Sequence, residues 1–242
     1  MARWNASGAS ADLTSAGLSA LSEAHPPSNP PVTLSRQAPE PHPLYDVSKR
    51  LLDISLSAAI LLLAVPILAI AAAAILLTTR RSPLLVQRRA GLLGRGFSMI
   101  KLRTMATDDD EPPLDNPPLA PGEVFSAKAP DDPRVTPVGR LLRRTSIDEL
   151  PQLLNVLAGQ MSLVGPRPAL PGEVARYPLS WRPRLAVKPG MTGLWQVSGR
   201  SEVAPRRRTA MDRYYVRQRS TGMDCLVLIR TIAATVSMRG AW

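Results

Sequence analysis

The sequence predicts an α-rich α+β domain that is held on one side of a membrane, a monotopic arrangement. Three observations predict this class. Residues 54–79 carry no charged side chain, and about 20 apolar residues suffice to cross a bilayer. Residues 138–159 and 205–239 place apolar side chains at three-to-four spacing, which indicates amphipathic helices, including interfacial ones. Residues 97–102 have the pattern of a short strand, the small β element of the fold.

The chain divides into three segments. Residues 1–43 contain seven prolines and no sustained hydrophobic period, so we expect a disordered, proline-rich N-terminal tail. Residues 44–81 are expected to form the membrane-embedded element, and residues 82–242 a cytoplasmic domain. Within that domain, residues 107–134 are rich in Asp, Pro and Gly, which indicates a solvated loop rather than a metal site.

Two features of the apolar segment favour a re-entrant helix-break-helix over a simple span. Pro66 lies at its middle, where it removes a backbone hydrogen bond and bends a helix. Both flanks are basic, with Lys49 and Arg50 before the segment and Arg80 and Arg81 after it. Because cytoplasmic flanks collect Lys and Arg, we expect both ends on the cytoplasmic side. A kinked transmembrane span and a buried core helix stay open as alternatives.

The charge balance points to anionic partners. The chain has 30 Lys and Arg against 19 Asp and Glu, a net charge of +11. Aromatic residues make up only 4% of the chain, which argues against nucleic acid, because single-strand and RNA readers stack bases on aromatic rings. The single cysteine, Cys225, excludes an internal disulfide and a cysteine-based zinc site.

A basic run follows the apolar segment. Residues 80–103 hold seven Lys or Arg and no acid, which favours contact with anionic membrane lipid. Some of these charges are also available to bind a phosphorylated substrate, and the two roles are compatible.

The adjacent carboxylates Asp148 and Glu149 are the candidate catalytic residues. They lie among Arg143, Arg144 and Arg167, and paired acids among arginines suit phosphate chemistry at a metal ion. The same residues also fit a capping box, in which Ser146 caps a helix and Glu149 returns the bond. A helix N-terminus is itself an anion site, so one helix end could serve both roles.

Four motifs resemble the bacterial sugar transferase family, the monotopic phosphoglycosyl transferases. They are Lys-Leu-Arg-Thr-Met at 101–105, Asp-Glu-Leu-Pro-Gln-Leu at 148–153, Met-Ser-Leu-Val-Gly-Pro-Arg-Pro at 161–168 and Pro-Gly-Met-Thr-Gly-Leu-Trp-Gln-Val-Ser-Gly-Arg at 189–200. The resemblance covers residues 44–242. It implies that residues 82–242 are a sugar transferase catalytic domain on the cytoplasmic face of the bacterial inner membrane.

The resemblance also implies a mechanism. The family's aspartate, here Asp148, attacks the sugar-bearing phosphate of a UDP-sugar and releases UMP, and undecaprenyl phosphate then takes up the sugar phosphate. Glu149 is implied as the ligand of Mg²⁺, and downstream glycosyltransferases are expected partners. The expected substrate-binding cations are Lys101, Arg103, Arg143, Arg167 and Arg200.

Two positions depart from the family pattern. Members commonly have Ser-Pro at the membrane kink, where this chain has Val65-Pro66. Members often have an acid at the position of Gln160, so a metal role there is in doubt. Two other functions therefore stay open: a membrane-tethered basic protein that binds lipid or nucleic acid, and an inactive scaffold. Glucose and galactose are the usual sugars of compact members, but the sequence does not name the sugar.

Overall fold

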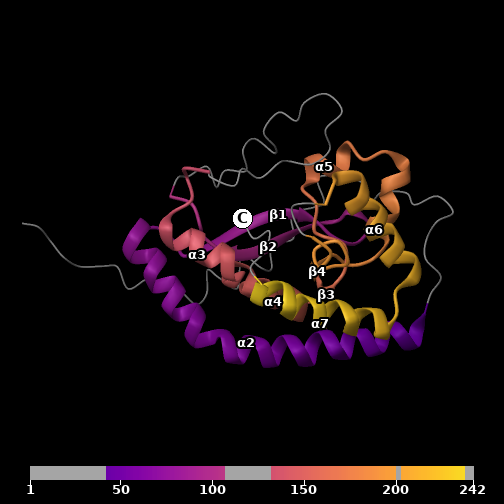
Figure 1. The fold of residues 1–242 in the computed structure, drawn as a ribbon, viewed down its shortest axis with the longest axis horizontal. Helices are drawn as coiled ribbons and strands as arrows, with labels where there is room; N and C mark the ends of the chain where they lie inside the picture. The colour runs from indigo at the N-terminus through magenta and orange to yellow at the C-terminus, as the bar shows by residue number, and fades with distance from the viewer. Residues whose placement is uncertain (1–41, 107–131, 200–202, 238–242) are drawn as a thin grey trace, which may run out of the picture.

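The computed structural model describes residues 42–106, 132–199 and 203–237. These residues form a helix-rich domain with two small two-stranded sheets (Figure 1). The predicted tail at 1–43 and loop at 107–134 lie almost wholly outside the described residues. In chain order the elements are α2 (Pro43–Thr79), β1 (Leu84–Ala90), a short 3-10 turn (Leu92–Gly94), β2 (Gly96–Leu102), α3 (Pro137–Thr145), the 3-10 helix η3 (Ile147–Gln152), α4 (Leu153–Leu157), β3 (Ser162–Val164), α5 (Pro171–Ala175), the 3-10 helix η4 (Leu179–Ala186), β4 (Gly190–Thr192), α6 (Pro205–Gln218) and α7 (Thr221–Ser237).

The apolar segment forms one continuous helix of 37 residues, α2, and Pro66 lies inside it. It is the one helix of the described chain that is long and apolar enough to cross a membrane. Figure 1 shows α2 running along the lower edge of the molecule and turning upward near α3. Its middle exposes large apolar side chains, among them Leu62, Leu63 and Ile70, each more than 70% exposed. A helix-rich domain with a small β element and one long apolar helix compatible with membrane association is confirmed, whereas the re-entrant path of α2 stays a prediction.

Both ends of α2 contact the same domain. Near its start, Asp53 is buried, and its carboxylate accepts a hydrogen bond from the backbone N–H of Leu163 at 3.0 Å. Near its end, Ala71 and Ile75 pack in one apolar cluster with Leu102 of β2 and with Leu142 of α3. The domain therefore contacts α2 near both of its ends, and Leu56, Ile60 and Leu61 between them pack against the main core.

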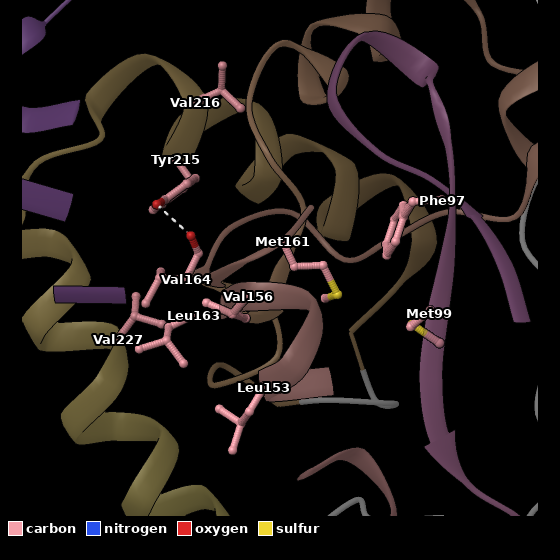
Figure 2. Packing of buried hydrophobic residues seen from close by; sticks show 10 residues of the cluster. All are labelled: Phe97, Met99, Leu153, Val156, Met161, Leu163, Val164, Tyr215, Val216 and Val227. Atoms are coloured by element: carbon pink, nitrogen blue, oxygen red, sulfur yellow. Dashed lines mark hydrogen bonds between the residues drawn. The ribbon is translucent and has the colours of Figure 1, made fainter. Parts of the chain in front are cut away.

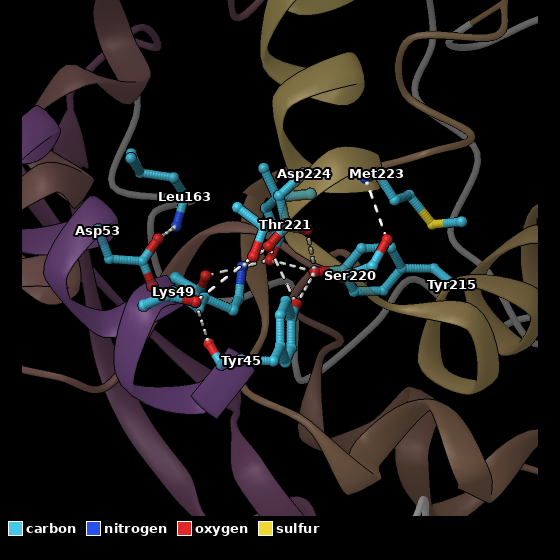
Figure 3. A network of polar contacts seen from close by, with 12 residues as sticks. Tyr45, Lys49, Asp53, Leu163, Tyr215, Ser220, Thr221, Met223 and Asp224 are labelled. Atoms are coloured by element: carbon cyan, nitrogen blue, oxygen red, sulfur yellow. Dashed lines mark hydrogen bonds and ion pairs between the residues drawn. The ribbon is translucent and has the colours of Figure 1, made fainter. Parts of the chain in front are cut away.

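A buried polar network fastens the start of α2 to α6 and α7 (Figure 3). Asp224, which is 1% exposed, forms an ion pair with Lys49 at 2.9 Å and accepts a hydrogen bond from Tyr45 at 3.0 Å. The hydroxyl of Tyr215 lies within hydrogen-bond distance of Asp224, at 2.8 Å, and of the carbonyl of Val164, at 3.0 Å. The network therefore links the membrane helix to the strand that precedes the Gly-Pro-Arg-Pro motif.

Strands β1 and β2 form an antiparallel hairpin in which Leu85 opposes Lys101 and Arg89 opposes Phe97. The predicted strand at 97–102 is confirmed as β2, but β1 was missed because its charges concealed its alternation. Opposed residues share a face of a sheet, so Arg89, Phe97 and Lys101 lie on one face. Phe97 belongs to the main core, which Figure 2 shows between the hairpin, α4, β3, α6 and α7.

The outer edge of β2 is closed by a side chain. Asn155 of α4 is 1% exposed, and its amide oxygen accepts from the N–H of Ile100 at 3.0 Å. Its amide nitrogen donates to the carbonyl of Ser98 at 2.7 Å and to Oε1 of Gln160 at 2.6 Å. Asn155 thus replaces a third strand and fixes the hairpin against α4.

Candidate active site

The carboxylate pair lies in the short 3-10 helix η3, directly after a turn at Ser146. Ser146 adopts a left-handed conformation (φ 59°, ψ 18°), and its N–H donates to the carbonyl of Arg143 at 3.1 Å. The predicted capping box is wrong, because Ser146 ends α3 and its side chain makes no capping bond. Asp148 and Glu149 are both half-buried. Because no α-helix begins at Ser146, we expect the positive charge that binds an anion here to come from the cationic side chains around Asp148 and Glu149.

Arg143 is aimed by a tight contact between α3 and the end of the hairpin. Its Nε donates to the hydroxyl of the buried Thr104 at 2.9 Å. Gly139 lies so close that a Cβ there would fall 2.0 Å from the carbonyl oxygen of Thr104. Burial has the largest effect on the pKa of Arg143 and lowers it, and the charge of Asp148 has the next largest effect and raises it. The Lys-Leu-Arg-Thr-Met motif therefore contributes Thr104, which orients a cation next to the candidate nucleophile.

Lys101 of β2 lies near the same residues, Arg143 and Asp148. Burial is the largest cause that lowers its pKa, to about 8, followed by repulsion from Arg89. Asp148 and Glu149 act in the opposite direction and favour its charged form. Lys101 therefore lies among two acids and other cations, as expected of a phosphate-binding lysine.

Arg89 is a member of this group that sequence reasoning assigned only to the basic run. It is 9% exposed, and burial together with nearby Arg167 lowers its pKa to about 10. Glu149 and Glu173 offset part of that effect. Pairing residues 84–90 with 96–102 as a hairpin would have placed Arg89 and Lys101 on one face, but this requires that β1 be recognised first.

Arg167 is placed by a backbone contact between two motifs. Gly165 and Gly190 approach so closely that a Cβ on Gly190 would fall 2.1 Å from the nitrogen of Gly165. The N–H of Gly165 donates to Thr192, and that of Gly190 to Pro166, which continues the parallel pairing of β3 and β4. These glycines therefore fix the loop that carries Arg167.

A buried ion pair supports this loop from behind. Arg184 and Asp212 are 2.6 Å apart and at most 4% exposed. Arg184 also donates to the hydroxyl of Tyr177 at 2.8 Å and to the carbonyl of Arg167 at 3.3 Å. Burial raises the pKa of Asp212 to about 6, while Arg184 and Arg167 oppose the rise. No sequence motif pointed to this pair, whose members lie on η4 and α6.

The other sequence-predicted positions fall elsewhere. Arg103 donates through Nε to the carbonyl of Ser82 at 2.8 Å, and burial, followed by the charge of Arg81, lowers its pKa. The structure thus brings Lys101 and Arg143 together with the acid pair and places Arg167 near Arg89, whereas Arg103 contacts Ser82 and lies near Arg81. Arg200 lies outside the described residues. Gln160 binds Asn155, which is a structural contact.

The described residues supply carboxylates for a magnesium ion but not a complete set of protein ligands. No group of three or more His, Cys, Asp or Glu side chains gathers anywhere in residues 42–106, 132–199 and 203–237. Mg²⁺ is commonly bound by one or two carboxylates, together with phosphate oxygens of the substrate and water. Asp148 and Glu149 supply carboxylates of that kind, so the site fits an ion that arrives with a phosphorylated ligand.

The chain is similar to known proteins of one family. A family model described as bacterial sugar transferase matches residues 44–238. Exopolysaccharide production protein ExoY of Sinorhizobium fredii is 36% identical over 204 residues, covering 83% of this chain and 90% of that protein. UDP-glucose:undecaprenyl-phosphate glucose-1-phosphate transferase of Caulobacter vibrioides is 40% identical over 225 residues, 89% of this chain and 80% of that protein.

A third relative is longer. Undecaprenyl-phosphate galactose phosphotransferase of Salmonella typhimurium is 40% identical over 199 residues. The match covers 80% of this chain and 41% of that protein. A long apolar helix on a domain with paired carboxylates near cations fits a sugar phosphotransferase, the class that these relatives' names give. The chain belongs to the bacterial sugar transferase family.

Proposed function

We propose that this protein transfers a sugar 1-phosphate from a UDP-sugar to undecaprenyl phosphate and so begins exopolysaccharide or related glycan synthesis. The observation that carries the proposal is the meeting of separate motifs at one place. Lys101, Arg143 and Arg89 come from different elements and surround Asp148 and Glu149. Relatives whose names specify undecaprenyl-phosphate sugar transfer support the same reaction.

In the first step, a carboxylate oxygen of Asp148 attacks the sugar-bearing phosphorus of the UDP-sugar. The new bond joins Asp148 to that phosphorus, and the bond that breaks leads to the uridine-bearing phosphate, which leaves as UMP. Arg143 and Lys101 interact with Asp148, whose carboxylate form is the nucleophile. The covalent intermediate divides one difficult transfer into two easier steps.

In the second step, a phosphate oxygen of undecaprenyl phosphate attacks the same phosphorus. The bond to Asp148 breaks, the carboxylate is restored, and the product is undecaprenyl diphosphate carrying the sugar. Lys101 and Arg143 offset negative charge on the transferring group during both steps. Glu149 would hold Mg²⁺ through its carboxylate. Such an ion, when bound, would neutralise charge on the phosphate oxygens.

The lipid acceptor requires the site to stay near the membrane, and the two attachments of α2 support that placement. Asp53 binds β3 at one end, and Ile75 packs on Leu102 at the other, so both ends lie on one domain. We infer that α2 enters the cytoplasmic leaflet of the inner membrane and returns, which leaves the catalytic domain in the cytoplasm.

The alternative of a basic binding protein without catalysis leaves the paired carboxylates unexplained. The experiment that decides is a UMP-release screen of purified protein, with undecaprenyl phosphate and Mg²⁺, over a panel of UDP-sugars. Release with one or a few sugars is expected, and it would also identify the donor. Absence of UMP with every donor would refute the proposed function.

A further inference from the structure

Arg89 is a buried cation to which the steps above assign no role. It is 9% exposed. Its Nη2 donates to Oε1 of Gln87 at 2.8 Å, and its Nη1 donates to the carbonyl of Pro168 at 3.3 Å. Its Nε is buried and has no hydrogen-bond partner among the residues that the structure describes. In that part of the chain, no carboxylate forms an ion pair with Arg89.

The surroundings of Arg89 are short of negative charge. Arg167 is the largest electrostatic influence on Arg89, and Arg89 in turn is the largest on Lys101. Glu149 and Glu173 act on Arg89 more weakly than Arg167 does. Burying a charge without a paired counter-ion is costly, and adding cations to it raises the cost. An anion bound at this point would relieve both penalties.

The cations form a sequence of electrostatic neighbours. Arg143 and Lys101 both interact with Asp148, Lys101 and Arg89 both interact with Glu149, and Arg89 also interacts with Arg167. A diphosphate whose sugar-bearing phosphorus faces Asp148 would direct its other phosphate toward the second group. We propose that Arg89, together with Arg167, binds the phosphate of the leaving nucleotide. This inference rests on the proposed function.

The hairpin separates this role from lipid binding. Arg88 and Arg89 are adjacent in β1, so their side chains point to opposite faces of the sheet. Arg88 is exposed and available to headgroups, whereas Arg89 is buried on the face that carries Lys101. Arg88 is therefore a matched control with the same charge and an adjacent position.

The test compares Arg89→Gln with Arg88→Gln in the full-length protein in lipid nanodiscs. Calorimetry measures UMP affinity, and a chase measures how fast the sugar-phosphate adduct passes to undecaprenyl phosphate. Arg89→Gln should weaken UMP binding at least tenfold, since charge-assisted bonds to phosphate are lost. It should leave the chase within twofold, because UMP has already departed. Arg88→Gln should change neither.

Each result decides the matter. Unchanged UMP affinity in Arg89→Gln would overturn this inference but not the proposed function. An equal loss of UMP binding and of adduct transfer would do the same, because a merely structural role predicts that result. Wild-type protein that forms no adduct and binds no UMP would overturn the proposed function as well. If the Gln variant does not fold, Arg89→Lys should weaken UMP at least threefold, and an unchanged affinity there would refute the inference.

Discussion

Arg143 and Arg144 are sequence neighbours with different surroundings. Arg143 is held by Thr104 and interacts with Asp148, whereas Arg144 is exposed. We predict that Arg143→Ala lowers kcat/KM more than tenfold, since a charge-assisted bond to phosphate is worth about 1.5–3 kcal/mol. Arg144→Ala, measured in the same UMP-release assay, should stay within twofold of wild type. Similar losses in both variants would assign Arg143 to general surface charge.

Lys101 predicts a pH dependence. Its pKa is lowered to about 8, so the ammonium is charged below that pH and is lost as the pH rises through it. The profile of kcat/KM reports the free enzyme, and it should therefore fall on the alkaline side with a midpoint near pH 8. Lys101→Arg keeps its charge throughout this range, so its profile should remain flat there. The same alkaline fall in that variant would exclude Lys101 as its cause.

At the residue scale, the motifs pointed to the acid pair and to Lys101 and Arg143, which the structure places near it, because all four lie in short conspicuous segments. They gave no warning about Ser146, whose left-handed backbone ends α3. Arg89 and the Arg184–Asp212 pair were missed because their importance arises from burial. Burial of a charge is a tertiary property that local spacing does not encode.

At the scale of elements, Asn155 joins α4 to the hairpin. Asn155→Ala would leave the N–H of Ile100 and the carbonyl of Ser98 without their partner. We predict a loss of about 1–3 kcal/mol in the free energy of unfolding, the usual cost of an unsatisfied buried group. Denaturant titration of the protein in detergent measures it.

Gln160, which accepts a hydrogen bond from Asn155, allows a second substitution at the same contact. Gln160→Asp restores the acid that other members often carry and still offers an oxygen to the amide of Asn155. We expect stability within about 0.5 kcal/mol of wild type, as for substitutions that keep their contacts, and UMP release within twofold. A large gain in activity would instead indicate that the acid binds metal.

The helices were more predictable than the strands. The charge-free run and the three-to-four spacing of leucines survive as α2, α3 and α4. Strand β1 was hidden because Arg88 and Arg89 look alike in sequence, although one is exposed and the other buried. Strands β3 and β4 have three residues each, and they are defined by the approach of Gly165 to Gly190.

At the scale of the whole molecule, the attachments of α2 place the long apolar helix against the domain. The fold class followed from the sequence, but the network of Lys49, Tyr45, Tyr215 and Asp224 did not. Its members are far apart in the chain and meet only when α2 lies against α6 and α7. Such contacts have no local signal.

The topology can be tested with two exposed positions that flank α2. His42→Cys and Ser82→Cys are each made in a Cys225→Ser background, because Cys225 is exposed. In intact cells, both should resist an impermeant thiol reagent, since the proposed re-entrant path keeps both flanks on the cytoplasmic side. After permeabilisation both should react. Labelling of one position alone in intact cells would establish a transmembrane span.

The central claim is that Asp148 carries the sugar phosphate. Wild-type protein incubated with its UDP-sugar and no lipid acceptor should gain the mass of one sugar phosphate on a peptide that contains Asp148. Asp148→Asn keeps the shape but removes the anionic nucleophile, so it should gain no mass and lose nearly all turnover with little change in melting temperature. An adduct on another residue, or near-normal turnover by Asp148→Asn, would contradict the account.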